Sequence, residues 1–152
     1  MSGTSCAVVG LEVAGVPRGK QRPRAVRMGK HARMYTPKQT VEYENLVRLA
    51  YATSAKNFRF ADDAQLRVEI TAYYDVPKSA TKKAKSRMLS GELRPTKKPD
   101  FDNIAKIVCD SLNGIAYRDD AAIVSASVEK WYAENPRVSV KIMEVQTGEQ
   151  SL

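Results

Sequence analysis

Five charged residues in the second half of the chain have types and spacings that suit chemistry on phosphate esters. Asp100 and Asp102 stand one residue apart at an expected helix start, and Lys106 follows one turn later. A second acidic pair, Asp119 and Asp120, precedes an expected strand. Hard divalent cations bind several carboxylate oxygens that converge on one point. Phosphoryl transfer uses such a cation together with a positioned cationic side chain. The pattern therefore indicates metal-dependent cleavage of a phosphodiester.

A purely structural interpretation of these residues is also available. Asp100 would cap the helix, and Asp102 would complement its dipole. Asp102, Lys106 and Asp110 step by four residues, which is the spacing of an exposed ion-pair ladder. The acidic pair at 119–120 would be an ordinary turn before a strand. Capping alone does not explain Lys106 or the second acidic pair, and from the residues alone both interpretations stay open.

The positive charge of the chain is concentrated in two segments. The 152 residues carry a formal net charge of +8 and have a pI near 9.6. Residues 17–38 contain eight Lys or Arg and no acid, and residues 78–98 contain eight with one acid. Such local excess is expected of a surface that binds phosphate backbones, although a solvated basic loop would look the same. The candidate DNA contacts are Arg18, Lys20, Arg22, Arg24, Lys82, Lys83, Lys97 and Lys98.

Cysteine and histidine usage excludes several other kinds of site. Cys6 and Cys109 lie far apart without CxxC spacing, so neither a disulfide framework nor a zinc site is indicated. This fits a reduced, cytoplasmic setting. The single histidine, His31, lies in the first basic segment and is expected to face DNA or solvent. The first residues lack a basic n-region and Glu12 interrupts their apolar run, so we expect no signal peptide, and no stretch of the sequence has the length expected of a membrane span.

Hydrophobic periodicity predicts the order strand, helix, strand, helix, helix, strand, strand. The expected helices are residues 37–55 with Thr36 as N-cap, a short basic helix from a Ser79 cap to about residue 89, and residues 101–112. The expected strands are residues 7–13, 65–75, 123–132 and 137–145, the last two as an antiparallel hairpin, with a surface loop or irregular hairpin over 17–33. We therefore expect one α+β domain over residues 1–152, with a mixed or mostly antiparallel sheet, helices on one side and a frayed tail at 147–152.

Alternation and helical spacing also predict which side chains are buried. In the strand at 65–75, five apolar residues alternate with five others. The expected buried stripe of the first helix is Val41, Tyr43, Leu46, Val47 and Ala50. That of the helix at 101–112 is Phe101, Ile104, Ala105, Val108 and Leu112.

The segment KPDFDNIAKIVCDSLNGIAYRDDAAIV closely resembles the signature of the RusA family of Holliday-junction resolvases. These are small dimeric endonucleases common in bacteria and their prophages. The segment from Gly19 to Arg24, the later Tyr35-Thr36-Pro37 and the segment from Tyr74 to Ser79 also resemble the family's pattern. The resemblance covers roughly residues 10–145. Its central motif is specific because it combines a spaced acidic pair, a helical lysine, Asn-Gly and an Asp-Asp pair.

The resemblance implies a site of three carboxylates and one lysine. By motif position these correspond to Asp100, Asp102, Asp120 and Lys106, with the three aspartates as metal ligands; roles for Asp119 and Asp110 stay open. It further implies dependence on Mg²⁺, which Mn²⁺ would replace, and a homodimer.

The implied reaction is paired symmetric nicking of a four-way DNA junction in DNA recombination and repair, with 5′-phosphate ends expected. Two alternative functions stay open. One is a nuclease for flaps, forks or other branched DNA, and the other is a non-catalytic, structure-selective DNA-binding protein.

Overall fold

A four-stranded mixed sheet forms the centre of the structure, which is a computed structural model that describes residues 7–145. The sheet strands are β1 (Val8–Ala14), β4 (Leu66–Asp75), β5 (Ile123–Ala133) and β6 (Arg137–Glu144). A separate hairpin consists of β2 (Arg24–Met28) and β3 (His31–Tyr35). The helices are α1 (Lys38–Ala55), α2 (Lys82–Leu89) and α3 (Phe101–Ser111), with a short 3-10 helix over Asp120–Ala122. The predicted α+β class and mixed sheet are confirmed.

The strand order is β1-β6-β4-β5, which puts β4 inside the sheet. β4 pairs antiparallel with β6 and parallel with β5. The predicted hairpin between β5 and β6 is therefore wrong, because β4 lies between these two strands. Every second residue of β4 is buried and most of the others are half-buried, as expected of an interior strand. The short link at 134–136 connects two strands that are separated in the sheet.

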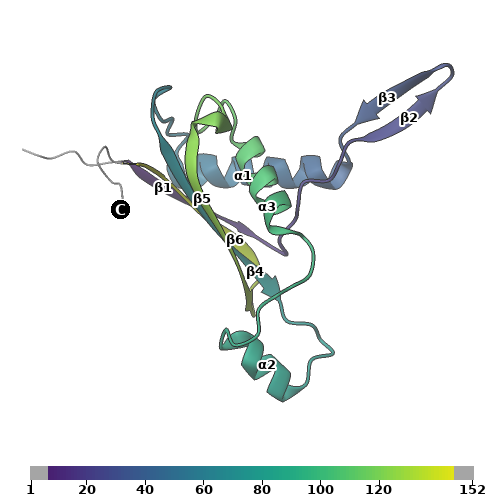
Figure 1. Ribbon diagram of the computed structural model, residues 1–152, viewed down its shortest axis with the longest axis vertical. Coiled ribbons are helices and arrows are strands. Elements are labelled where there is room, and N and C mark those ends of the chain that lie inside the picture. The colour runs from purple at the N-terminus through teal and green to yellow at the C-terminus, as the bar shows by residue number, and fades with distance from the viewer. Residues whose placement is uncertain (1–6, 146–152) are drawn as a thin grey trace, which may run out of the picture.

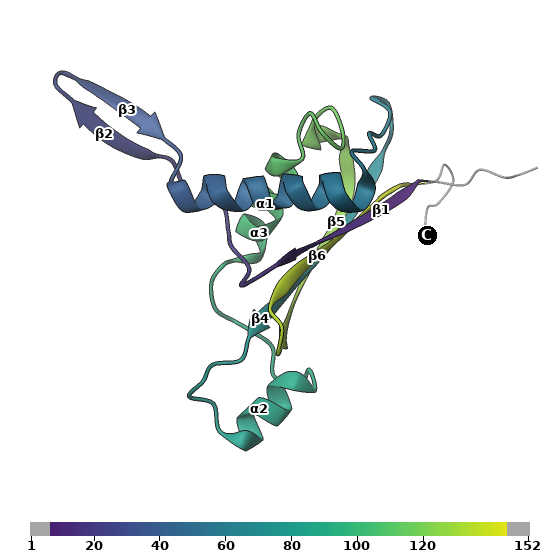
Figure 2. The same ribbon diagram turned by 180° about the vertical axis from the view of Figure 1, so that it is seen from behind.

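Helices α1 and α3 cover one face of the sheet, and the core lies between them and that face (Figures 1 and 2). The alternating apolar residues of β4 are all buried, as predicted. Together with residues of α1, α3 and the other strands they make one cluster that includes Leu66, Val68, Ile70, Ala72, Tyr74, Val47, Tyr51, Ile104, Ile107 and Ile142. This core fixes α3 on the sheet and so determines where the acidic motif lies.

The buried faces of the helices differ in part from the predicted stripes. In α1, Val41 and Leu46 are exposed, whereas Thr40 and Glu44 are buried. In α3, Phe101 is 64% exposed while Ile104, one turn later, is fully buried. The core therefore ends between these two residues, and the first turn of α3 projects beyond it.

Two of the predicted helix caps are also wrong. Pro37, not Thr36, occupies the N-cap position of α1, and no side chain caps that helix. Thr36 directly follows the last residue of β3, so the chain turns into the helix one residue later than predicted. The cap of α2 is Thr81 rather than Ser79, and its hydroxyl accepts a hydrogen bond from the backbone N–H of Ala84 at 3.1 Å.

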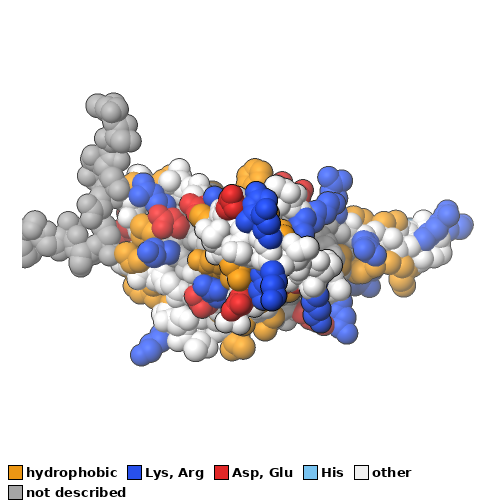
Figure 3. All heavy atoms as spheres, turned by 90° about the horizontal axis from the view of Figure 1, so that it is seen from below, with side chains coloured by type: hydrophobic (Ala, Val, Ile, Leu, Met, Phe, Trp, Pro, Cys, Tyr) orange, Lys and Arg blue, Asp and Glu red, His pale blue; other side chains and the backbone are white. Residues whose placement is uncertain are grey.

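Two basic elements project from the body in different directions (Figure 1). All ten residues of β2 and β3 are exposed, which confirms a surface hairpin within the first basic segment. α2 has no buried residue. Figure 3 shows Lys and Arg side chains along the projecting hairpin and on the face turned toward the viewer.

The predicted tail at 147–152 lies outside the described residues. No helix within residues 7–145 is both long and apolar enough to cross a membrane.

Candidate functional site

The start of α3 carries the first acidic pair at the protein surface. Asp100 occupies the N-cap position, but its side chain makes no capping hydrogen bond. Asp102 lies in the first turn, where the helix dipole favours a negative charge. Both side chains belong to exposed residues. Capping therefore does not account for Asp100, and its carboxylate is accessible to a ligand.

Contacts from two other parts of the chain hold the start of α3 in place. The Tyr74 hydroxyl, at the end of β4, donates a hydrogen bond to the carbonyl oxygen of Pro99 at 2.6 Å. The backbone N–H of Lys20 donates to the carbonyl oxygen of Asn103 at 2.9 Å. Gly19 packs so closely that a Cβ there would lie 2.9 Å from Pro99 Cβ and 3.0 Å from Asn103 Cβ. The acidic motif is thus positioned by β4 and by the loop that leads to the hairpin.

The ion-pair ladder of the purely structural interpretation does not form along α3 within the described residues. Lys106 is exposed, and no ion pair joins it to a carboxylate within residues 7–145. Asp110 instead lies with its Oδ2 3.6 Å from the Nζ of Lys20. The ammonium group of Lys106 is therefore accessible one turn after Asp102.

The second acidic pair lies in the 3-10 turn before β5. The Asp119 side chain accepts a hydrogen bond from the backbone N–H of Ala121 at 3.1 Å and caps this turn. Partial burial raises the pKa of the Asp120 carboxyl above its usual range, and repulsion from Asp119 and Asp110 adds to the shift. A hydrogen bond between the Asp110 and Asp120 carboxyls, which requires a proton on one of them, raises the pKa of Asp120 further. Asp119 thus has a structural role, and Asp120 faces a second carboxylate.

The carboxylates do not converge on one preformed metal site within the described residues. Across residues 7–145, no group of three or more His, Cys, Asp or Glu side chains is close enough to hold a metal ion. The charges of Asp110 and Asp119 raise the pKa of Asp120. The charge of Asp100 raises the pKa of Tyr74 and opposes the lowered pKa of Lys130. Carboxylate oxygens are the donors that hard cations prefer, so the chemistry fits Mg²⁺ although the arrangement is not a closed cage. The assignment of Asp100, Asp102 and Asp120 as ligands stays a prediction.

The prediction from sequence missed Lys130, which lies close to the acidic motif. Its Nζ donates a hydrogen bond to the carbonyl oxygen of Lys97 at 2.6 Å and lies 5.0 Å from the centre of the Tyr74 ring. Burial lowers the pKa of Lys130, and the nearby Asp100 opposes this shift. Lys130 reaches this place because β5 pairs with β4, with Lys130 opposite Ala72. No local pattern in the sequence reveals that pairing.

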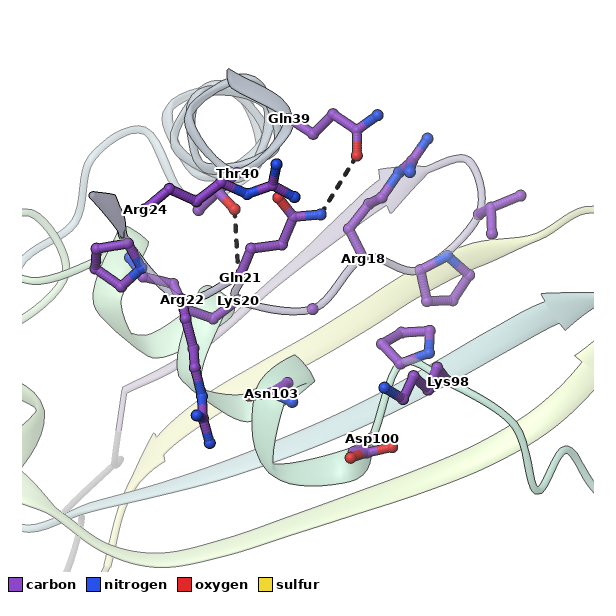
Figure 4. A pocket seen from close by; sticks show the side chains of 15 residues that line it. Arg18, Lys20, Gln21, Arg22, Arg24, Gln39, Thr40, Lys98, Asp100 and Asn103 are labelled. Carbon is purple, nitrogen blue, oxygen red and sulfur yellow. Dashed lines mark hydrogen bonds between the residues drawn. The ribbon is translucent and has the colours of Figure 1, made fainter. Parts of the chain in front are cut away.

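A basic cavity of about 840 Å³ adjoins Asp100. Figure 4 shows Asp100 and Lys98 on the α3 side, facing the loop that runs from Arg18 to Arg24. Five predicted DNA-contact residues line it: Arg18, Lys20, Arg22, Arg24 and Lys98. Lys82 and Lys83 lie outside the cavity on α2, and Lys97 is exposed nearby with its Nζ 6.0 Å from the centre of the Tyr132 ring. Cations around a carboxylate-bearing helix start suit a phosphate backbone that passes close to the acids.

Comparison with known proteins assigns the family. The sequence profile of the family described as Endodeoxyribonuclease RusA matches residues 14–143, which include both the basic loop and the acidic motif. The chain is also 38% identical over 136 residues to a protein of Bacillus subtilis (strain 168) named Uncharacterized protein YqaN. That alignment covers 88% of this chain and 94% of the relative. With a match over most of its length, the chain belongs to the RusA endodeoxyribonuclease family.

Proposed function

We propose that this chain resolves four-way DNA junctions by paired symmetric nicks that leave 5′-phosphates. The observation that carries the proposal is the cavity that Asp100 lines together with Arg18, Arg22 and Lys98. Because phosphates bind to clustered cations, this cavity would bring a DNA strand to the acidic helix start. Such a juxtaposition suits cleavage at the bound strand, since binding alone needs no carboxylate beside the phosphate.

Branched DNA suits the two projecting basic elements. The hairpin and α2 extend in different directions, and α3 lies between them (Figure 1). Arg24 lies on the hairpin, while Lys82 and Lys83 lie on α2. Contacts of this kind would hold separate DNA arms through their phosphates without reading their sequence. A straight duplex would engage the two elements less readily than a junction, whose arms diverge.

In the proposed site, Asp100, Asp102 and Asp120 would hold Mg²⁺, for which Mn²⁺ would substitute. When bound, this ion would stabilise charge on the scissile phosphate and lower the pKa of a water molecule. Asp100 and Asp102 project from one helix start, whose positive dipole end stabilises both carboxylates. Lys106 neutralises charge that develops on the phosphate in the transition state. A cation near Asp120 would also relieve its repulsion with Asp110.

A homodimer would place two such sites in opposition. A four-way junction is resolved by cuts in two strands of like polarity, which are related by two-fold symmetry. A C₂ dimer offers the same site twice with that symmetry. We therefore propose that the active species is a homodimer with one cut from each subunit.

The test compares three labelled DNA substrates in Mg²⁺: a synthetic four-way junction, a flap and a linear duplex. The proposal predicts symmetric paired nicks in the junction and little cleavage of the other two. Equal cleavage of the flap would favour a nuclease for branched DNA in general. Binding to the junction without cleavage, in Mg²⁺ and in Mn²⁺, would favour a non-catalytic binding protein and contradict the proposal.

A further inference from the structure

Lys20 is placed differently from the other cations of its loop. Its Nζ lies 2.5 Å from Glu44 Oε2 and 3.6 Å from Asp110 Oδ2, and its side chain is only 20% exposed. Arg18 and Arg22 are exposed, and neither forms an ion pair with a carboxylate within residues 7–145. Those two arginines present their charge to solvent, whereas the charge of Lys20 is directed into the protein.

Glu44 explains why Lys20 turns inward. Glu44 lies on the buried face of α1, and its side chain is 11% exposed. A buried carboxylate is costly unless an opposite charge compensates it, and Lys20 is the cation that the structure places beside it. Drawing Lys20 away to a DNA phosphate would leave Glu44 without that partner. The ion pair therefore disfavours a direct contact between Lys20 and DNA.

The backbone on either side of Lys20 is clamped between two helices. Gly19 packs against Pro99 and Asn103, and the N–H of Lys20 donates to the carbonyl oxygen of Asn103. The N–H of Gln21 donates to the Thr40 hydroxyl on α1 at 3.4 Å. Residues 19–21 thus join α3 to α1 immediately before the segment that leads into the hairpin.

The second partner of Lys20 leads to the proposed active site. Asp110 lies near the end of α3, close enough to Asp120 for its side chain to raise the pKa of that carboxyl. A series of polar contacts therefore runs from Glu44 through Lys20 and Asp110 to Asp120. Asp110 repels Asp120, and the nearby charge of Lys20 offsets part of this repulsion.

We propose that Lys20 is a positioning residue, which bridges Glu44 and Asp110 and does not bind DNA phosphate. It fixes the base of the hairpin relative to α3 and orients Asp110 against Asp120. This inference rests on the proposed function, because Asp120 matters to catalysis only if the site cleaves DNA. The absence of a phosphate contact from Lys20, however, can be tested by binding alone.

The binding test measures junction affinity in EDTA over a range of salt concentrations. The variant is Lys20→Gln with Glu44→Gln, which removes both members of the buried ion pair, so that Glu44 is not left as an unpaired buried charge. Its salt slope should equal that of the wild type, whereas Arg18→Gln should reduce the slope by about 0.9 if Arg18 contacts one phosphate. An equal reduction in the Lys20→Gln/Glu44→Gln variant would overturn the proposal. This result does not depend on whether the protein cleaves DNA.

The kinetic test asks whether Lys20 acts through Asp110. Lys20→Gln/Glu44→Gln should lower kcat by about tenfold or more with little change in KM, as expected of a misplaced catalytic group. Lys20→Arg, which keeps the ion pair, should retain most of the activity.

A triple variant tests whether Lys20 and Asp110 act through the same contact. Adding Asp110→Asn to Lys20→Gln/Glu44→Gln should lower kcat no further than Asp110→Asn alone does, because both changes act on one contact. The positioning role would be overturned if the kcat losses of Asp110→Asn and of the double variant multiplied when combined. A normal kcat in the double variant would overturn it as well. Absence of cleavage by the wild type would instead refute the proposed function and leave the binding test to decide on Lys20.

Discussion

The hydroxyl of Tyr74 donates a hydrogen bond of 2.6 Å to the carbonyl oxygen of Pro99, the residue before Asp100. Tyr74 lies at the end of the central strand β4, and its side chain is buried. The bond therefore connects the most buried strand of the sheet to the start of the acidic motif. It anchors the segment that carries the exposed carboxylates of Asp100 and Asp102 to the core.

Replacing Tyr74 with Phe should loosen this connection. The change leaves the Pro99 carbonyl without its donor, which we expect to lower the free energy of unfolding by about 1–3 kcal/mol. Junction cleavage should fall as well, because Asp100 is less well held. Tyr73→Phe is the matched control, since within residues 7–145 the Tyr73 contact is that of its ring with Arg137, which Phe retains. Urea denaturation and cleavage assays on both variants check this, and equal losses would contradict the role of the Tyr74 hydroxyl.

Gly19→Ala should disturb the contact between the basic loop and α3. The added Cβ would meet Pro99 Cβ at 2.9 Å and Asn103 Cβ at 3.0 Å. Overpacking of this kind costs about 1–3 kcal/mol of stability. Gly10→Ala is the control, because its Cβ would have an ordinary contact of 3.6 Å with the Val140 carbonyl oxygen. Thermal unfolding of both variants distinguishes them, and a neutral Gly19→Ala would show that the loop moves away without cost.

Removing cations from either projecting element should weaken DNA binding and reduce its dependence on salt. Arg22→Gln with Arg24→Gln affects the loop and the hairpin, and Lys82→Gln with Lys83→Gln affects α2. The slope of log affinity against log salt should fall by about 0.9 for each phosphate that a variant no longer binds. Lys141→Gln removes an exposed cation from β6 and serves as the control. If both double variants had the same salt slope as the Lys141→Gln control, DNA would bind to neither projecting element.

Asp120→Asn should stabilise the metal-free protein near neutral pH. Burial and neighbouring carboxylates raise the folded-state pKa of Asp120 above its usual value of 3.8, so the folded protein holds the proton more tightly than the unfolded chain. The resulting penalty is absent below the unfolded pKa and grows as pH rises through the folded one. The gain from Asp120→Asn should therefore shrink as pH falls toward 4. Unfolding in EDTA at pH 7 and pH 4 measures this, with Asp63→Asn as an exposed control. A gain that is independent of pH would have another cause.

Local patterns predicted the elements of this fold well. The alternation in β4 identified its buried residues correctly because each strand residue points to the face opposite that of its neighbour. The expected helix at 101–112 was close to α3, yet Phe101 is exposed. Periodicity shows which residues share a face but does not show where along the helix the covering core ends.

Non-local pairing limited the rest of the prediction. β5 and β6 are joined by a short link that suggests a hairpin, but β4 pairs with both and separates them. The same limitation hid Lys130, which reaches Asp100 only through the pairing of β5 with β4. It also hid the inward position of Lys20, because its partner Glu44 is 24 residues away. Charge counting identified the basic loop correctly and could not show which of its cations is already paired.

The most direct test of the account compares wild type with Asp102→Asn on a labelled four-way junction, with cleavage in Mg²⁺ and binding in EDTA measured in parallel. Asp102 is an exposed first-turn residue, so the change should leave the fold intact. We expect symmetric paired nicks by the wild type, none by Asp102→Asn, and equal or tighter binding by the variant because a negative charge near phosphate is removed. Full cleavage by Asp102→Asn would contradict the proposed site.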